Sequence, residues 1–91
     1  MKLLMFYRQD AEYTRHVEEY VHDLVLSHNI KNQDIVRVDP DTALGASKAS
    51  AYGMMAYPGM VVTDENGEYI HGWSGDLPLA DELMGYLFSL Q

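Results

Sequence analysis

The feature that most constrains the fold is an uninterrupted apolar run, Leu-Leu-Met-Phe-Tyr, at residues 3–7. This run lies between two cations, Lys2 and Arg8. A strand with one solvent-facing side alternates apolar and polar residues, whereas a central strand of a sheet covered on both faces is apolar throughout. The run therefore predicts a central strand, in a sheet that helices cover on both faces.

An amphipathic helix is predicted over residues 10–28. Asp10 suits its N-cap, and Glu12 lies in the first turn, where the helix dipole favours a negative charge. Asn29 suits the position just beyond the helix C-terminus. Apolar residues recur at helical spacing along one face of this segment: Tyr13, Val17, Tyr20, Val21 and Leu24.

Three further strands are predicted, over residues 34–39, 60–63 and 68–72. The turn between the last two reads Asp-Glu-Asn-Gly at residues 64–67, and its Asn-Gly pair is a strong signal for a hairpin. The strand at 34–39 instead follows a helix, which makes it a parallel partner of the first strand in a right-handed βαβ unit.

Two further helices complete the pattern. One is expected over residues 43–54, rich in small residues and capped by Asp41 or Thr42. The last begins near Asp76 or Leu77 and carries its apolar face on Leu79, Leu83, Tyr86, Leu87 and Leu90, with Pro78 in its first turn. The order β-α-β-α-β-β-α predicts an α/β fold in which helices cover both faces of a central mixed sheet of four strands. A single domain over residues 1–91 is expected.

The chain contains no cysteine, which excludes disulfides, thiolate nucleophiles and sulfur-ligated metal sites. Fourteen acidic residues against six basic ones give a net charge of −8, and the basic residues are scattered. No basic stripe exists to neutralise phosphates, so neither nucleic acid nor an anionic membrane surface is expected as a partner. The apolar run at the N-terminus is too short for a signal peptide or a membrane span, which predicts a cytoplasmic protein.

Three segments carry a resemblance to a known superfamily. Residues 52–62, Tyr-Gly-Met-Met-Ala-Tyr-Pro-Gly-Met-Val-Val, resemble the Y-G-V-x-x-x-P segment that precedes an apolar strand in thioredoxins and glutaredoxins. Residues 66–68, Asn-Gly-Glu, stand where that family has a hairpin turn. Residues 71–78, His-Gly-Trp-Ser-Gly-Asp-Leu-Pro, resemble the W-S-G-x-x-P segment of the small NrdH-type redoxins that serve ribonucleotide reductase. The resemblance implies a thioredoxin-like fold.

The redox motif of that family is missing. Relatives have C-x-x-C between the first strand and the first helix, and the corresponding residues here are Ala11, Glu12, Tyr13 and Thr14. Neither the methyl group of Ala11 nor the hydroxyl of Thr14 can form a disulfide. The family chemistry also needs a thiolate stabilised at a helix N-terminus, and acidic residues stand there in this chain. We therefore expect a redox-inactive protein that is not an enzyme of thiol–disulfide chemistry.

The resemblance also implies a binding face. In relatives the proline corresponding to Pro58 follows a cis bond and faces the redox motif, and the backbone before it pairs with an extended peptide or with glutathione. Gly59 replaces the Thr or Val found in many relatives, which is expected to make this groove roomier. Adaptable and aromatic side chains are typical of binding surfaces. The face is expected to comprise Ala11, Thr14, Met55, Tyr57, Pro58, Gly59 and Trp73.

Arg8 and Asp76 fall near the places where glutaredoxins hold the charged ends of glutathione. The alternative reading of these two residues is a solvated strand end and a helix N-cap, and it is the favoured one. A metal site is not expected. His16, His22 and His28 are spaced six residues apart on one helix, whereas helical metal ligands are three or four residues apart. Glu18 and His22 are expected to form a surface pair, and no cofactor is predicted.

The leading functional hypothesis is a non-catalytic interaction domain that binds a protein partner or a second copy of itself. The alternative is a glutathione-binding or glutathione-transferase-like protein in which a hydroxyl, from Tyr7 or Thr14, replaces the cysteine. The acidic residues at the N-terminus of the predicted helix oppose an anionic ligand such as glutathione, which makes this the less favoured hypothesis. A third reading is a decayed redoxin without a selected activity.

Overall fold

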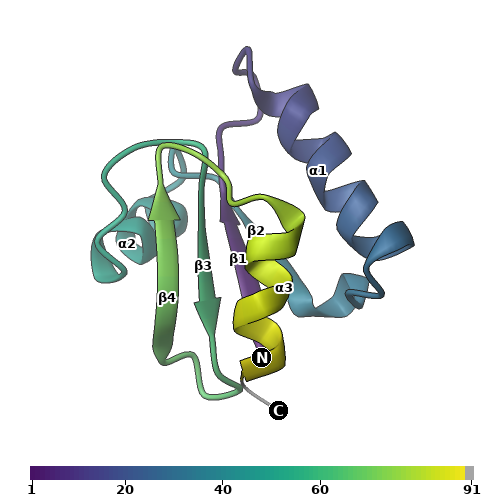
Figure 1. Ribbon diagram of the computed structural model, residues 1–91. Helices are drawn as coiled ribbons and strands as arrows, with labels where there is room; N and C mark the ends of the chain where they lie inside the picture. Colours follow the sequence, from purple (N-terminus) through teal and green to yellow (C-terminus); the bar gives the residue numbers. More distant parts are fainter. Residues whose placement is uncertain (90–91) are drawn as a thin grey trace.

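A four-stranded mixed sheet lies at the centre of the computed structural model, which describes residues 1–89 (Figure 1). Its strands follow the order β2-β1-β3-β4. β1 runs parallel to β2 and antiparallel to β3, and β4 runs antiparallel to β3. The strands are β1 (Lys2–Phe6), β2 (Ile35–Val38), β3 (Gly59–Thr63) and β4 (Tyr69–Ser74).

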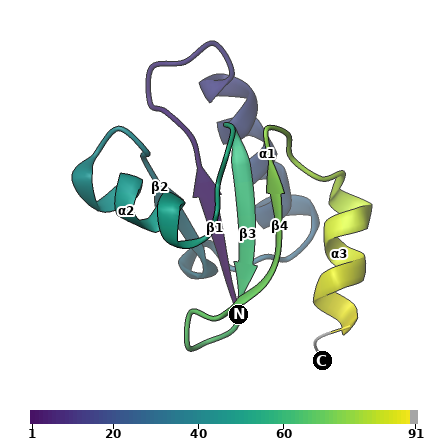
Figure 2. The ribbon, with the colours of Figure 1, turned by 90° about the vertical axis from the view of Figure 1, so that its left-hand side faces the viewer.

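Helices cover both faces of this sheet (Figures 1 and 2). α1 (Thr14–Ser27) and α3 (Ala80–Ser89) lie on one face, and α2 (Ala43–Ala51) lies on the other. A short 3₁₀ turn, η1 (Asn32–Asp34), leads into β2. The predicted four-stranded arrangement with helices on both faces is confirmed.

Successive side chains of β1 enter two separate cores. Leu3 and Met5 pack in the cluster beneath α1 and α3, and Leu4 and Phe6 pack in the cluster beneath α2. Adjacent residues of a strand point to opposite faces, so a strand that is buried on both sides needs apolar residues at every position. The apolar run therefore supplies the central strand that joins the two cores.

The predicted start of the first helix is wrong. α1 begins at Thr14, four residues later than expected, and its N-cap residue Tyr13 makes no side-chain capping bond. The Thr14 hydroxyl donates to the carbonyl of Arg8 at 2.7 Å and accepts from the N–H of Ala11 at 2.9 Å. These bonds hold the preceding residues in a turn, so Asp10 is not a cap and lies outside the helix.

The two ends of α2 follow local rules. Thr42, one of the two expected caps, accepts a hydrogen bond from the N–H of Gly45 at 2.9 Å. The helix ends at Ala51, three residues earlier than predicted, because Gly53 takes a positive φ of 69°. The N–H of Met54 then bonds back to a carbonyl of the last turn, which satisfies that helix end.

α3 also begins later than predicted, at Ala80. The hydroxyl of Tyr20 on α1 donates to the carbonyl of Pro78 at 2.7 Å, which holds this segment against α1 outside the helix. Leu79 is consequently 78% exposed and does not belong to the buried face, whereas Leu83 and Leu87 are buried as expected. Leu90 lies outside the described residues.

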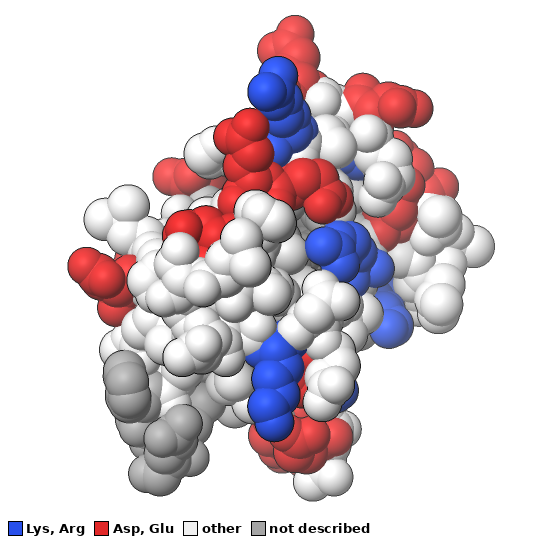
Figure 3. All heavy atoms as spheres, turned by 90° about the vertical axis from the view of Figure 1, so that its right-hand side faces the viewer, with Lys and Arg blue, Asp and Glu red and all other residues white. Residues whose placement is uncertain are grey.

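Charge is distributed unevenly over the surface. On the side of the molecule that α1 and α3 form, acidic side chains crowd the upper part, and a broad uncharged region lies below them (Figure 3).

Within residues 1–89, no helix has the length and apolar character needed to cross a lipid bilayer.

Candidate functional site

Strand pairing brings most of the predicted site residues to one end of the sheet. Phe6 pairs with Gly59, and Gly59 in turn pairs with Ser74. The β1–α1 loop (residues 7–13), the proline loop (residues 54–58) and the end of β4 therefore meet at the same edge. A binding site that uses all three segments could form only here.

The β1–α1 loop is tied together by the residues at the two ends of the degenerate motif. Besides the two Thr14 bonds, the backbone N–H of Arg8 donates to the hydroxyl of Tyr13 at 3.1 Å. The N–H of Thr14 also donates to the carbonyl of Ala11 at 3.2 Å, which closes a turn. The Thr14 hydroxyl is thus committed to the loop, and Glu12 is exposed at its tip.

Tyr7, the other hydroxyl considered as a cysteine substitute, is fully buried. Its hydroxyl donates to the carboxylate of Glu18 on α1. Burial and the neighbouring carboxylate raise the pKa of Tyr7 to about 12. In the transferase-like role, a hydroxyl that assists the thiolate of glutathione works better with a lowered pKa. The raised pKa of Tyr7 therefore opposes this role.

The proline loop is fastened to β4 by a single side chain. The Ser74 hydroxyl oxygen accepts from the N–H groups of Met55 and Ala56, both at 2.9 Å. The N–H of Gly75 donates to the carbonyl of Ala56 at 3.0 Å. A cis bond was expected before Pro58, and the bond that joins it to the preceding tyrosine is cis. The serine of the W-S-G segment therefore positions the proline loop.

The expectation of a roomier groove at Gly59 is wrong. A Cβ at this position would lie 2.3 Å from the Sδ atom of Met54 and 2.8 Å from the carbonyl oxygen of Trp73. The thioether of Met54 thus occupies the space that the side chain of a Thr or Val would take. Gly59 is required by this close packing and does not open a cavity.

One group of predicted residues does form a continuous surface. The guanidinium carbon of Arg8 lies 5.1 Å from the ring centroid of Tyr57, in a cation–π arrangement. The same side chain forms an ion pair with Asp41, with 3.1 Å between Nε and Oδ1. Met55 stands beside them with 87% of its surface exposed. We call Arg8, Met55 and Tyr57 the proline-loop surface.

A hollow of about 390 Å³ adjoins the proline-loop surface. Its other side is formed by α2, whose small residues Ala46, Ala49 and Ser50 line it. The absence of larger side chains on this part of α2 explains why the surface is concave. The hollow could accommodate a side chain or a turn of a partner protein.

Trp73 and Asp76 are among the predicted residues that do not join this surface. The ring of Trp73 points to the face covered by α1 and α3, where it lies 4.6 Å from His71 and 5.5 Å from Tyr86, measured between ring centroids. Trp73 pairs with Met60, whose side chain faces the same core, so the strand alternation dictates this direction. Asp76 accepts a local bond, from the N–H of the next residue at 2.9 Å. Arg8 is likewise engaged, by Asp41.

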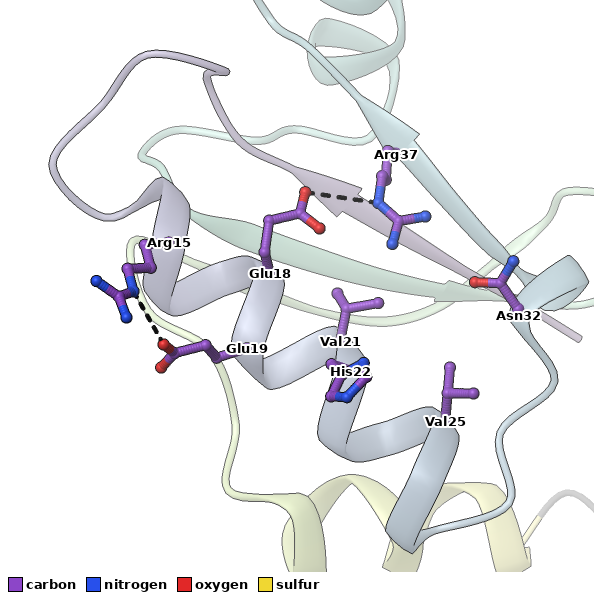
Figure 4. Close-up of a pocket in the computed structure, with 8 residues that line it drawn as sticks. All are labelled: Arg15, Glu18, Glu19, Val21, His22, Val25, Asn32 and Arg37. Carbon is purple, nitrogen blue, oxygen red and sulfur yellow. Dashed lines mark hydrogen bonds and ion pairs between the residues drawn. The ribbon is translucent and has the colours of Figure 1, made fainter.

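A second cleft, between α1 and β2, was not anticipated (Figure 4). Glu18 accepts from Tyr7 at its base and lies 3.6 Å from Nε of Arg37, so it does not pair with His22 as predicted. Within residues 1–89, no group of three or more His, Asp or Glu side chains is placed to hold a metal ion. The sequence signal for the cleft was a charged residue, Arg37, in the middle of an otherwise apolar strand.

Comparisons with known proteins identify the fold. No protein-family model matches the sequence, and no curated protein matches it. The structure matches that of thioredoxin 1 from the thermophilic eubacterium Thermosipho africanus TCF52B, with a TM-score of 0.70 and 15% sequence identity over 100% of both chains. The chain therefore has a thioredoxin-like fold without any cysteine.

Proposed function

We propose that this domain is a redox-inactive relative of the glutaredoxins and NrdH-type redoxins that acts in the cytoplasm as a protein-interaction module. It would bind a partner protein, or a second copy of itself, through the proline-loop surface and would catalyse no reaction. The observation that carries the proposal is the side chain of Met55, 87% exposed beside the stacked Arg8 and Tyr57. Tyr57 is half-buried against the core beneath α2, and an exposed methionine beside such an anchored aromatic ring and a hollow is typical of protein-binding surfaces.

The way in which the surface is built supports this role. The Ser74 hydroxyl accepts a hydrogen bond from the backbone N–H of Met55. Asp41 forms an ion pair with the guanidinium that stacks on Tyr57. The side chains are thus presented on a fixed frame, which lowers the entropy lost when a partner binds. The glutathione alternative lacks comparable support, because both candidate hydroxyls are engaged and Arg8 has Asp41 as its partner.

A pair of matched substitutions tests the proposal. Met55→Glu places a charge on the proline-loop surface, and Leu26→Glu places the same charge on α1, across the sheet, at a residue that is 68% exposed. Sedimentation at increasing protein concentration measures self-association, and affinity capture from the native host measures binding of a partner. We expect Met55→Glu to abolish association or capture with an unchanged thermal midpoint, and Leu26→Glu to preserve both.

Loss of binding in the Leu26→Glu variant alone would place the interaction on α1 and contradict the proposal. Equal binding by both variants and the wild type would contradict it as well. Addition of glutathione serves as a further check: saturable binding to the wild type, lost on substitution of Arg8 by Gln, would favour the alternative function.

A further inference from the structure

The cleft between α1 and β2 lies apart from the proline-loop surface and plays no part in the function proposed above. It has a volume of about 480 Å³, within the range of small-molecule sites. Val25 and the edge of the largely buried Val21 on α1 form the apolar side, and Asn32 and Arg37 stand opposite, at the β2 side (Figure 4). An apolar wall with a few polar groups gathered at one end is the usual form of a ligand pocket.

The polar end of the cleft is built by three side chains from three elements. Tyr7, which follows β1, donates its hydroxyl to Oε1 of Glu18, and Nε of Arg37 lies 3.6 Å from the same oxygen. Because both interactions involve Oε1, they fix the orientation of the carboxylate. The second oxygen of Glu18 and one terminal nitrogen of Arg37 point toward the side of the cleft on which Val21 lies (Figure 4).

The charges of the cleft are balanced, although the whole chain carries −8. Arg37 is paired with Glu18, and Arg15 is paired with Glu19 at 3.1 Å on the outer rim. An anionic ligand would be attracted by Arg37 but repelled by Glu18. A cationic ligand would be attracted by Glu18 but repelled by Arg37. A neutral group that both donates and accepts hydrogen bonds avoids this repulsion and satisfies both side chains.

We propose that this cleft binds a small neutral molecule with a primary carboxamide group and a compact apolar body. The carboxamide oxygen accepts from the guanidinium of Arg37, and its NH₂ group donates to the carboxylate of Glu18. The apolar body packs against Val21 and Val25. Tyr7 acts as a positioning residue, since it touches the carboxylate and not the ligand.

Three probes of nearly identical shape test the chemistry: benzamide, benzoate and benzylamine. Each is titrated into the ¹⁵N-labelled full chain at neutral pH while backbone amide shifts are recorded. We expect saturable shifts with benzamide, centred on Val21, Val25 and Arg37, in the weak range usual for a fragment of this size. Benzoate and benzylamine should bind at least about tenfold more weakly, because each charge meets one like charge in the cleft.

Substitutions locate the interaction. Arg37→Gln should weaken benzamide binding by about tenfold, whereas Lys2→Gln, which removes the cation of a different surface ion pair with Asp34, should leave it unchanged. The ranking of the three probes on the wild-type protein provides a test that does not depend on whether a variant folds. Tighter binding of benzoate than of benzamide, shifts outside the cleft, or no saturation with any probe would overturn the proposal. Because Met55 lies elsewhere, its substitution should not alter these titrations.

Discussion

Replacement of Tyr7 by Phe isolates the hydrogen bond that links β1 to α1. The substitution keeps the buried ring and removes only the hydroxyl that donates to Glu18. A hydrogen bond to a charged group contributes about 1.5–3 kcal/mol to stability. Glu18 is partly exposed and retains Arg37, so we expect the lower end, about 1.5 kcal/mol, at neutral pH. For a domain of this size, that loss corresponds to a decrease of about 6–12 °C in the thermal midpoint.

The pH dependence of the same comparison gives a sharper test. The pKa of Tyr7 is raised from 10.0 to about 12 in the folded state, so folding favours the protonated hydroxyl. The resulting stabilisation is fully present below pH 10 and is lost as the pH rises through 12. A shift of about two pKa units corresponds to about 2.7 kcal/mol. The wild type is expected to be more stable than Tyr7→Phe at neutral pH. This difference in stability should therefore vanish near pH 11, about one unit above the pKa of Tyr7 in the unfolded chain.

Urea denaturation of both proteins at intervals from pH 7 to pH 12 measures this difference. The Tyr7→Phe/Glu18→Gln double substitution completes a mutant cycle and should show coupling between the two side chains. Equal stability of wild type and Tyr7→Phe at pH 7, or a stability difference that stays constant up to pH 12, would refute the reasoning.

Three further substitutions test local features of the fold. Gly59→Val should destabilise the protein by about 1–3 kcal/mol in urea denaturation, because the new side chain collides with Met54; Gly59→Ala should have a smaller effect of the same sign. Thr42→Ala should cost about 1 kcal/mol in the same assay, since the N–H of Gly45 loses its acceptor, and Thr42→Ser should restore most of this loss. Ser74→Ala should accelerate hydrogen exchange of the two amides that it binds in the proline loop, whereas unchanged exchange would show that the loop is held by other contacts.

The order and pairing of the elements could be predicted from the sequence because the signals are local and repeated. An apolar run that feeds two cores and an Asn-Gly turn between two short strands each specify a local structure. The helix boundaries were harder to predict, because hydrogen bonds outside the helical pattern decide them. The start of α1 depends on bonds between Thr14 and the end of β1, and the start of α3 depends on Tyr20, 58 residues before the carbonyl that it binds.

The sequence identified segments that meet at one end of the sheet, but not the direction of each side chain. The resemblance of residues 52–62 to the redoxin segment identified the proline loop, which lies next to the β1–α1 loop. Trp73 was assigned to the wrong face because its direction depends on the register of β4, which a β-bulge beside Thr63 alters. The partnership of Arg37 with Glu18 could not be seen, since it joins residues that no sequence pattern relates.

The central position of β1 has a consequence for the order in which the protein can assemble. β1 is synthesised before the other three strands of this sheet, and its partners lie on both sides: Leu3 pairs with Ile35 and with Val62. The most apolar segment of the chain therefore has no complete set of neighbours until β3 has been synthesised. Pairings this distant in sequence slow folding, and an exposed apolar strand invites contacts with other chains. During that interval, α1 can cover one face of the nascent strand and α2 the other.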